Sequence, residues 1–387
     1  MKLIFHDAPQ HLALLPLTFA RPLADWRLGI LTIAEKWQRR WPEAQVHFHT
    51  VAYLQEKYPL PPQGEAIYLP AGLCATDELV TEVATLKPGE ALKQGSLLLA
   101  YHAEAPAEEP QAWLKDAREF SGACVCVEKP WDIFRHNGAE LQRDYDLLTR
   151  GRTSASLDSS NTVLGDRIFV EEGVEAQAAT FNAQEAPIYL GNNSKVLEGS
   201  LIKGGLAMGP HAVLKMGAKI YGPTTLGPYC KVGGEVNNSV FHSYSNKGHD
   251  GFLGNAVIGQ WCNLGADTNN SNLKNNYDEI KVWSYARKGF TRTGLQFCGL
   301  LMGDHSKCGI NTMFNTGTVV GFSANIFGAG FPRTFIPSFS WGGAAGFSTY
   351  RLDKALDTAQ RMMARRDLAL SPADRRIFEH IFHQAPS

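Results

Sequence analysis

The chain has 387 residues, of which 44% are hydrophobic, and its 37 basic residues nearly balance 38 acidic ones. A chain of this length and composition forms two or more domains with a sizeable core. The formal net charge of -1, without long runs of one sign, gives no argument for nucleic acid or an anionic membrane, and we expect neither as a partner. The start, MKLIFHDAPQHLALLPL, has no sustained apolar segment with a cleavage site, so we expect a cytoplasmic protein.

Residues 1–150 mix strand-like and helix-like segments, which indicates an α/β layer domain. Strands are predicted over 2–7, 65–70, 96–101 and 123–128, and helices over 31–41, 111–120 and 138–151. The stretches YPLPPQG and EAPAEEPQ predict surface loops between them. The seven cysteines of the chain are odd in number and lack CxxC spacing, so we expect reduced thiols that act as small apolar fillers.

From residue 190 onward a six-residue period dominates the sequence. Apolar residues recur at Leu190, Val196, Ile202, Met208, Leu214, Ile220, Leu226 and Val232, again at Ile258 and Leu264, and again at Met302, Cys308, Phe314, Val320 and Ile326. The residue two positions earlier is mostly small. Short strands of about six residues that turn a corner, three of them making one coil of roughly 18 residues, explain this period, whereas a helix or a flat sheet does not. The spacing predicts a parallel β-helix over 186–345, preceded by a linker and first coil at 151–185.

Two regions break this period, at 236–254 and 267–295. Rigid coils can carry segments whose sequence is not dictated by packing, so we expect function there. Residues 346–387 have helical periodicity, and SPADRRIFEHIFHQ opens with Ser371 as N-cap, Pro372 at the first helical position and Asp374 in the first turn. We expect a tail of two helices, packed on the β-helix or on a neighbouring subunit.

The first break contains NKGHDGFLG, in which His249 lies between Gly248 and Gly251. Acyl transfer to an amine needs a base that removes the proton from nitrogen and donors that bind the developing oxyanion. A neutral imidazole suits the first task, and the glycines let the backbone approach a ligand. The side chains of Asn263 and Asn272 are candidate donors. The backbone N–H groups around Gly265 and Ala266 are candidates for the same role.

The segment NKGHDGFLGNAVIGQWCNLGADTNNSNLKNNYD resembles the acetyltransferase part of the bifunctional N-acetylglucosamine-1-phosphate uridyltransferase/glucosamine-1-phosphate acetyltransferase family, which has KxGHxxYLG, NIGAGT and an Asn-Tyr-Asp loop. The resemblance implies that His249 is the general base, that Asn263 contacts the sugar and that Asn272 lies near the acetyl group. Phe252 replaces a substrate-contacting tyrosine, and Asp267 replaces a glycine. A divergent branch of this family shares GGEVNNSVFHSYSNKGHDGFLG and the N-terminal PLTFARPLADWRLGILTIAEKW at 16–37.

This resemblance also implies a left-handed β-helix, a homotrimer, and acetyl-CoA as acyl donor lying along the coils between subunits. For the sugar phosphate, Lys219 and Lys247 are candidates together with Lys203 and Lys215. For the phosphates of the coenzyme, we consider Arg287, Lys288 and Arg292. The N-terminal domain is expected to resemble a sugar-1-phosphate nucleotidyltransferase, but it lacks the glycine-rich triphosphate loop. In place of that loop are Thr18, Arg21, Arg27 and Lys36.

Mg²⁺ is expected if this domain is active, with Asp7 and Asp77 as the acids near strand ends, although the sequence leaves the metal ligands open. The sequence therefore predicts an acetyl-CoA-dependent N-acetyltransferase for a glucosamine-1-phosphate-like sugar phosphate, coupled to nucleotidyl transfer that gives a nucleotide sugar such as UDP-N-acetylglucosamine. Three alternatives remain: nucleotidyl transfer only, a non-catalytic scaffold that binds a nucleotide sugar, or a zinc hydratase. Zinc ligands for the last would come from His211, His242, His249 and His305.

Overall fold

A computed structural model describes residues 1–7 and 10–385 of the chain. It divides into two compact units. Unit 1 comprises Met1–Leu14, Ala20–Trp26 and Leu31–Lys129, and unit 2 comprises Leu15–Phe19, Arg27–Ile30 and Pro130–Ser387. The predicted fold class is confirmed: an α/β domain, a parallel β-helix and C-terminal helices are all present. Within the described ranges, no helix is both long and apolar enough to span a bilayer.

Unit 1 is built on a mixed sheet with strand order β2-β1-β3-β5-β4-β6. Its strands are β1 (Lys2–His6), β2 (Gln45–His49), β3 (Ala66–Pro70), β4 (Ala91–Gln94), β5 (Leu97–Ala103) and β6 (Arg118–Glu119). Its α-helices are α1 (Ile33–Arg40) and α2 (Asp77–Ala84), and its short 3-10 helices are η1 (His11–Leu14), η2 (Leu23–Asp25), η3 (Ala52–Leu54) and η4 (Pro110–Lys115). Helix α1 begins at a capping box in which Thr32 and Glu35 bond each other's backbone N–H groups.

Two predicted elements of this region are wrong. Residues 111–120 do not form an α-helix: the turn η4 places Trp113 in stacked contact with Tyr101 at 5.0 Å, and the chain then pairs with β4 as β6. Residues 123–128 do not join the sheet as a strand. They bond instead to the loop at 72–74, through Val127 N–H to the Gly72 carbonyl and Cys74 N–H to the Val125 carbonyl. The alternating pattern of apolar residues predicted a strand, but the partner is a loop.

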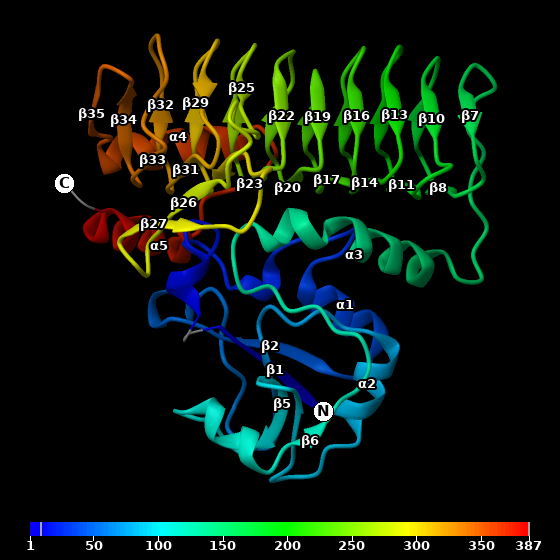
Figure 1. Ribbon diagram of the computed structural model, residues 1–387, viewed down its shortest axis with the longest axis vertical. Helices are drawn as coiled ribbons and strands as arrows, with labels where there is room; N and C mark the ends of the chain where they lie inside the picture. The colour runs from blue at the N-terminus through cyan, green and yellow to red at the C-terminus, as the bar shows by residue number, and fades with distance from the viewer. Residues whose placement is uncertain (8–9, 386–387) are drawn as a thin grey trace. The chain divides into compact units, whose positions relative to one another are not determined.

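Unit 2 contains the β-helix, whose strands stack in chain order on three faces (Figure 1). The first face consists of β7 (Thr162–Leu164), β10 (Thr180–Asn182), β13 (Leu201–Lys203), β16 (Lys219–Tyr221), β19 (Glu235–Asn237) and β22 (Phe252–Gly254). The second face consists of β8 (Ile168–Val170), β11 (Ile188–Leu190), β14 (Leu206–Met208), β17 (Thr224–Leu226), β20 (Val240–Ser243), β23 (Val257–Gln260), β28 (Leu301–Met302), β31 (Val319–Val320) and β33 (Phe335–Ile336).

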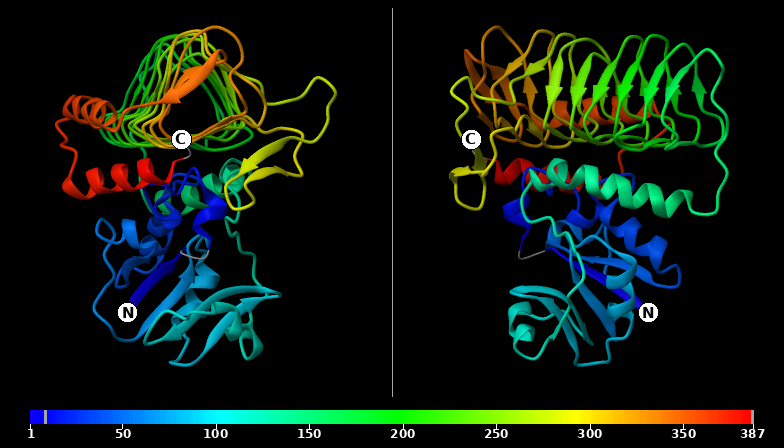
Figure 2. Two further views of the ribbon diagram at one scale, coloured as in Figure 1. Left: turned by 90° about the vertical axis from the view of Figure 1, so that its left-hand side faces the viewer. Right: turned by 45° about the vertical axis from the view of Figure 1, so that its right-hand side comes forward.

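The third face consists of β9 (Glu175–Ala176), β12 (Lys195–Val196), β15 (Val213–Leu214), β18 (Lys231–Val232), β21 (Asn246–Lys247), β24 (Asn263–Leu264), β29 (Lys307–Cys308), β32 (Asn325–Ile326) and β34 (Ser340–Gly343), to which β35 (Gly346–Thr349) adds antiparallel. Two further strands, β25 (Asn269–Asn270) and β30 (Met313–Phe314), pair with each other. Viewed along its axis, the coil has a triangular outline (Figure 2).

The six-residue period marks the inside of this triangle, as predicted. Every residue of the series from Leu190 to Val232 and from Met302 to Ile326 is buried in one continuous apolar core. Register shows why the period works: Val196 pairs with Leu214 and Leu214 pairs with Val232, so that residues 18 apart are stacked on neighbouring coils. Burial of each such side chain contributes about 1.5–3 kcal/mol. The small residues two positions earlier are equally buried and fit beside the corners.

The two breaks in the period differ in structure. Residues 236–254 stay within the coil and take shorter steps, so that Val236, Phe241, Lys247 and Leu253 occupy the inward positions. Residues 267–295 leave the coil after β25 and form an antiparallel hairpin of β26 (Lys281–Ser284) and β27 (Gly289–Arg292). The hairpin projects from the triangle (Figure 2).

The C-terminal tail contains the two predicted helices, α4 (Leu352–Ala364) and α5 (Pro372–Gln384). Ser371 caps α5 in a capping box with Asp374, as the sequence indicates. The ring of Phe378 on α5 contacts His305 at 4.8 Å and Phe322 at 4.6 Å between ring centroids, so this helix packs on a corner of the coil.

Helix α3 (Asp132–Thr149) begins six residues earlier than the predicted start at 138 and belongs to unit 2. It packs on the second face: the Asn137 side chain donates to the Pro223 carbonyl at 2.9 Å and accepts from the Thr225 hydroxyl at 3.0 Å. That hydroxyl also lies 2.8 Å from the Gly29 carbonyl. The sequence predicts a domain limit near residue 150. In the structure, unit 1 ends at Lys129, and residues 27–30 belong to unit 2.

Coil stacking leaves no room for a side chain at Gly227, where an added Cβ would lie 1.6 Å from the His242 carbonyl oxygen. We expect Gly227→Ala to lower the melting temperature by about 10 °C or more, because the coils must separate locally. Gly289→Ala is the matched control, since its nearest neighbour would be 3.8 Å away. Thermal unfolding followed by circular dichroism tests this, and equal melting of the two variants would contradict it.

Candidate active site

A cavity of about 650 Å³ lies beside the third face of the coil, at the corner that carries His249. Its lining residues come from five adjacent coils, those of β15, β18, β21, β24 and β29, and from helix α4 of the tail with the two residues after it. They are Lys215, Lys231, Tyr244, Asn246, Gly248, His249, Trp261, Asn263, Leu264, Gly265, Ala266, Ile310, Met362, Arg365 and Arg366. Five residues predicted from the sequence are therefore brought together in one cavity: Lys215, His249, Asn263, Gly265 and Ala266.

Two aromatic rings line this cavity, Tyr244 and Trp261, with their centroids 4.3 Å apart. They belong to a stack at one corner of the coil that runs through His211, Tyr229, Tyr244, Trp261 and His305. Each of the five adopts the left-handed backbone conformation, with φ between 54° and 61°. Because every coil turns the corner in the same way, the rings project in parallel and are stacked at about the spacing of neighbouring strands.

Four cations border the cavity: Lys215 and Lys231 on the third face, and Arg365 and Arg366 at the end of α4. Burial lowers the pKa of Lys231, and the positive charges of Arg366, Lys215 and Arg365 lower it further. No carboxylate is among the described residues that line the cavity. An electropositive cavity with two guanidinium groups is suited to a phosphate-bearing ligand.

His249 lies at the corner between β21 and β22, and its side chain is exposed. In the part of the chain that the structure describes, its ring has no hydrogen-bond partner, so neither Asp250 nor a carbonyl fixes its tautomer. The Asn263 side chain is exposed on the neighbouring coil. An imidazole in this setting can accept a proton from a ligand that is held by the cations.

The two backbone donors predicted at this site differ. Gly265 N–H is already bonded to the Cys308 carbonyl at 3.1 Å, and a Cβ at Gly265 would lie 2.4 Å from the Gly309 backbone. Its glycine is thus explained by the close stacking of coils. Ala266 N–H has no acceptor among residues 1–7 and 10–385, so it is the better candidate for an oxyanion donor.

Lys247, predicted to bind substrate, is 1% exposed and does not line the cavity. Its ammonium lies inside the coil and donates to the carbonyls of Gly233 at 3.0 Å and His249 at 2.9 Å. Burial lowers the pKa of Lys247 to about 8, an effect partly offset by Asp250, Asp267 and Cys308.

Other predicted residues of unit 2 lie away from the cavity. Asn272 donates to the Asn255 side chain at 2.8 Å, at the end of β22 opposite to His249, and Phe252 is on the same strand. Lys219 is exposed on the first face. Asp267 adopts φ of 57°, a left-handed backbone conformation that glycine favours.

The basic residues of the hairpin also lie elsewhere. Arg292 pairs with Glu279 at 3.0 Å, and Arg287 and Lys288 are exposed in the turn between β26 and β27. None of the three lines the cavity within one chain. A role of these side chains toward the coenzyme remains a prediction.

The predicted phosphate ligands near the N-terminus are buried. In unit 1, Arg21 is 3% exposed and pairs with Asp25 at 3.0 Å, and Lys36 is fully buried in α1. In unit 2, Arg27 donates to the Ile30 carbonyl. None of these groups presents an exposed charge to a nucleotide.

Asp7 and Asp77 do not fit magnesium. Asp7 is fully buried and accepts from Leu23 N–H at 2.8 Å, and burial raises its pKa to about 6. Asp77, in the first turn of α2, pairs with Arg40 at 2.9 Å. Across the described ranges, no group of three or more His, Cys, Asp or Glu side chains is arranged to hold a metal ion. Of the histidines considered for zinc, His211 and His305 belong to the ring stack, and His242 lies 2.8 Å from the Ser243 hydroxyl.

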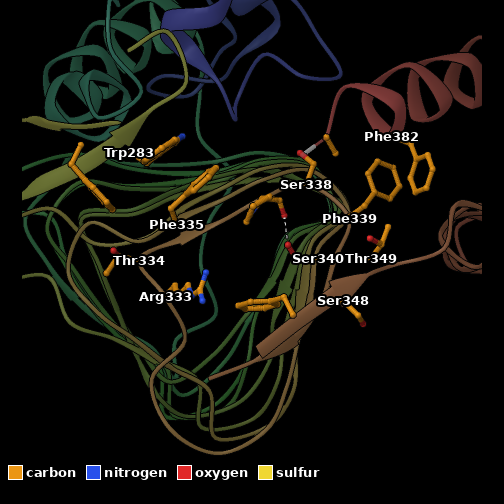
Figure 3. A pocket seen from close by; sticks show the side chains of 14 residues that line it. Trp283, Arg333, Thr334, Phe335, Ser338, Phe339, Ser340, Ser348, Thr349 and Phe382 are labelled. Atoms are coloured by element: carbon orange, nitrogen blue, oxygen red, sulfur yellow. Dashed lines mark hydrogen bonds between the residues drawn. The ribbon is translucent and has the colours of Figure 1, made fainter. Parts of the chain in front are cut away.

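A second cavity of unit 2, of about 940 Å³, lies at the C-terminal end of the coil (Figure 3). Aromatic rings from the hairpin, the last coil and α5 surround it, among them Trp283, Phe335 and Phe382. Trp283 and Phe335 stack with centroids 4.2 Å apart. Its described lining has hydroxyl groups and Arg333 but no histidine, carboxylate, lysine or thiol. Of these two cavities, only the one at His249 has an imidazole among its described lining residues.

Comparison with known proteins adds one family and several distant structural similarities. A family model described as sugar nucleotidyl transferase matches residues 3–153. The sequence matches none of the curated proteins with which it was compared. Among solved structures, the chain is similar to LpxA, a UDP-N-acetylglucosamine acyltransferase from Bacteroides fragilis, at 14% identity over 58% of this chain and 96% of that one, with a TM-score of 0.31.

It is also similar to the polySia-specific acetyltransferase NeuO, at 15% identity over 54% of this chain and 99% of that one, with a TM-score of 0.29. A third is AntD, an N-acyltransferase from Bacillus cereus solved with dTDP and 3-hydroxybutyryl-CoA, at 8% identity over 54% and 93%, with a TM-score of 0.23. With TM-scores below 0.5, these similarities carry no argument about what this chain does.

Sequence reasoning missed Tyr244, Trp261, Lys231, Arg365 and Arg366. For the rings a signal exists: each member of the stack immediately precedes the small residue of the six-residue period, as Tyr244 precedes Ser245 and Trp261 precedes Cys262. No sequence signal identifies Arg365 and Arg366, because only the packing of α4 beside the third face brings them to the cavity.

If the four cations hold phosphate, the double variant Arg365→Gln/Arg366→Gln should raise the Kd for inorganic pyrophosphate by roughly tenfold or more, since each charge-assisted bond is worth about 1.5–3 kcal/mol. Arg361→Gln is the control on the same helix, because Arg361 pairs with Asp357 and does not line the cavity. Isothermal titration calorimetry measures both, and equal affinity in the double variant and the control would contradict the assignment.

Proposed function

We propose that the cavity at His249 catalyses acyl transfer from acetyl-CoA to the amine of an amino-sugar phosphate. The observation that carries this proposal is that one cavity holds both the His249 imidazole and four cations. Among the residues that the structure describes, the imidazole has no hydrogen-bond partner and no carboxylate lines the cavity. A general base and an anion-binding wall are the two features that this substrate class requires. The likeness of residues 246–278 to the acetyltransferase segment of the bifunctional family supports the same reaction.

In the proposed mechanism, His249 removes the proton from the sugar amine while that nitrogen attacks the thioester carbonyl. The carbon–nitrogen bond forms, the carbonyl oxygen becomes negative, and Ala266 N–H donates to it. Collapse of the tetrahedral intermediate expels the coenzyme as a thiolate, which takes the proton from the imidazolium. The products are an N-acetyl sugar phosphate and the free thiol.

The other side chains that line the cavity bind and orient the substrate, and they take no part in proton transfer. Lys215, Lys231, Arg365 and Arg366 hold the phosphate, and the faces of Tyr244 and Trp261 support the sugar ring. Asn263 contacts the sugar hydroxyls. We include a homotrimer in the proposal, as the resemblance implies, with acetyl-CoA between subunits.

For residues 3–153 we propose nucleotidyl transfer to a sugar 1-phosphate, which the family match supports. The two halves would then act in sequence and yield a nucleotide sugar such as UDP-N-acetylglucosamine. Because Arg21, Lys36 and Asp7 are buried, other residues of this domain would have to hold the nucleotide, and a non-catalytic scaffold remains the alternative.

The acyl-transfer proposal is tested with acetyl-CoA and glucosamine-1-phosphate in a thiol-release assay. His249→Ala should lower kcat by about 10²–10⁴ through loss of the base, with the fold unchanged by circular dichroism. His211→Ala is the matched control, because His211 belongs to the ring stack but does not line the cavity. Absence of thiol release with amino-sugar phosphates in the unmodified protein would remove the proposal.

The nucleotidyl-transfer proposal is tested by pyrophosphate release from UTP and N-acetylglucosamine-1-phosphate, with and without Mg²⁺. We expect release that persists in His249→Ala, since the residues that the family model matches end at 153. Binding of the nucleotide sugar by calorimetry without any pyrophosphate release would instead support the scaffold alternative.

A further inference from the structure

Lys247 occupies an inward position of the third face, where the other coils have apolar or small residues. On the third face, register pairs Val232 with Lys247, and the next coil continues with Leu264, because Asn246 pairs with Asn263. The inward column of this face reads Ala176, Val196, Leu214, Val232, Lys247, Leu264, Cys308, Ile326 and Gly342. A lysine in this column is an exception that packing does not require.

The ammonium of Lys247 is held by two backbone carbonyls on different coils. It donates to Gly233, which follows its register partner Val232 on the coil before, and to His249, two residues further along its own chain. The space for it exists because residue 234 is glycine: an added Cβ there would lie 2.8 Å from the ammonium nitrogen and 2.8 Å from the His249 carbonyl oxygen. Gly234 and Lys247 therefore form one arrangement beneath the corner of His249.

Desolvation of a cation costs several kcal/mol unless it is paired and hydrogen-bonded. Methionine or leucine would fill the same volume in this apolar column without that cost. The lysine stabilises the backbone at the corner between β21 and β22, because its ammonium donates to the carbonyls of Gly233 and His249. An apolar residue cannot form these bonds.

We propose that Lys247 is a positioning residue, whose ammonium ties the His249 carbonyl to the Gly233 carbonyl and so fixes the corner that presents the imidazole to the cavity. This inference rests on the proposed function for its effect on catalysis. The fixing of the corner itself does not depend on that function, and it can be measured without a substrate.

Within the described ranges, the ammonium interacts electrostatically with Asp250 at the same corner, Asp267 on the next coil and Cys308 on the coil beyond. Burial depresses the pKa of Lys247 to about 8, below its usual 10.5, so the folded protein binds fewer protons than the unfolded chain between these values. The free energy of unfolding contributed by Lys247 is therefore lowest below pH 8 and rises from pH 8 to 10.5. An apolar residue at 247 removes this contribution.

The test is Lys247→Met, with Lys307→Met as matched control. Lys307 donates to the His305 carbonyl at 2.7 Å, and burial likewise lowers its pKa to about 8, but it lies at another corner. The amides of Gly233, Glu235 and Asp267 donate to the carbonyls of Lys247, Gly251 and Asp250, so their hydrogen exchange reports on this corner. Measured by mass spectrometry on the ligand-free protein, it should be at least tenfold faster in Lys247→Met and unchanged in Lys307→Met. Unchanged exchange in Lys247→Met, or equal acceleration in both variants, would overturn the proposal.

In the thiol-release assay, Lys247→Met should lower kcat by up to about 100-fold while the KM for the amino-sugar phosphate changes little, because the imidazole is misplaced but the cations are not. Unfolding by urea at pH 7.5 and pH 10 should give a smaller increase of stability with pH in this variant than in the unmodified protein. If methionine does not fold, Lys247→Leu repeats the experiment with the residue found at 214 and 264 of the same column. Faster exchange at the corner without acyl transfer in any variant would refute the proposed function and leave the positioning role intact.

Discussion

The structure of unit 2 depends on the registered stacking of coils, in which each strand pairs with the strand one coil before and one coil after. Val196, Leu214 and Val232 show this constraint, because they are 18 residues apart in sequence and adjacent in register. Stacking aligns every feature of one coil with the same feature of the next. The apolar column, the ring stack and the tight backbone contacts at Gly227 and Gly265 all follow from it.

The candidate site lies where the six-residue period breaks but the coils remain stacked. Between Val232 and Ile258 the coil takes shorter steps, and this places a charged residue, Lys247, inside and an exposed imidazole at the corner. A tail helix then contributes Arg365 and Arg366 to a wall that already holds two lysines. Burial lowers the pKa of Lys231, and the neighbouring positive charges lower it further, so an anionic ligand would stabilise the cluster.

Much of this architecture was accessible from the sequence because the coil is governed by local, periodic constraints. Spacing predicts the inward residues and the C-terminal helices. The sequence motif predicts that His249, Asn263 and Ala266 lie in one site. The strand predicted at 123–128 failed because alternation does not reveal which partner a segment meets. Arg366 could not be predicted, since a contact between a tail helix and a coil has no periodic signature. The sequence predicts Lys247 as a ligand of the sugar phosphate, and its burial could not be anticipated because lysines are seldom buried.

The ring stack gives the cavity an optical property of its own. Tyr229 and Tyr244 lie within 5 Å of each other, and Tyr244 lies 4.3 Å from Trp261, with ring planes inclined by 21° or less. Energy absorbed by the two tyrosines can pass along the stack to the indole, which also lines the cavity. The emission of Trp261 is thus coupled both to the stacking of several coils and to whatever occupies the space beside His249.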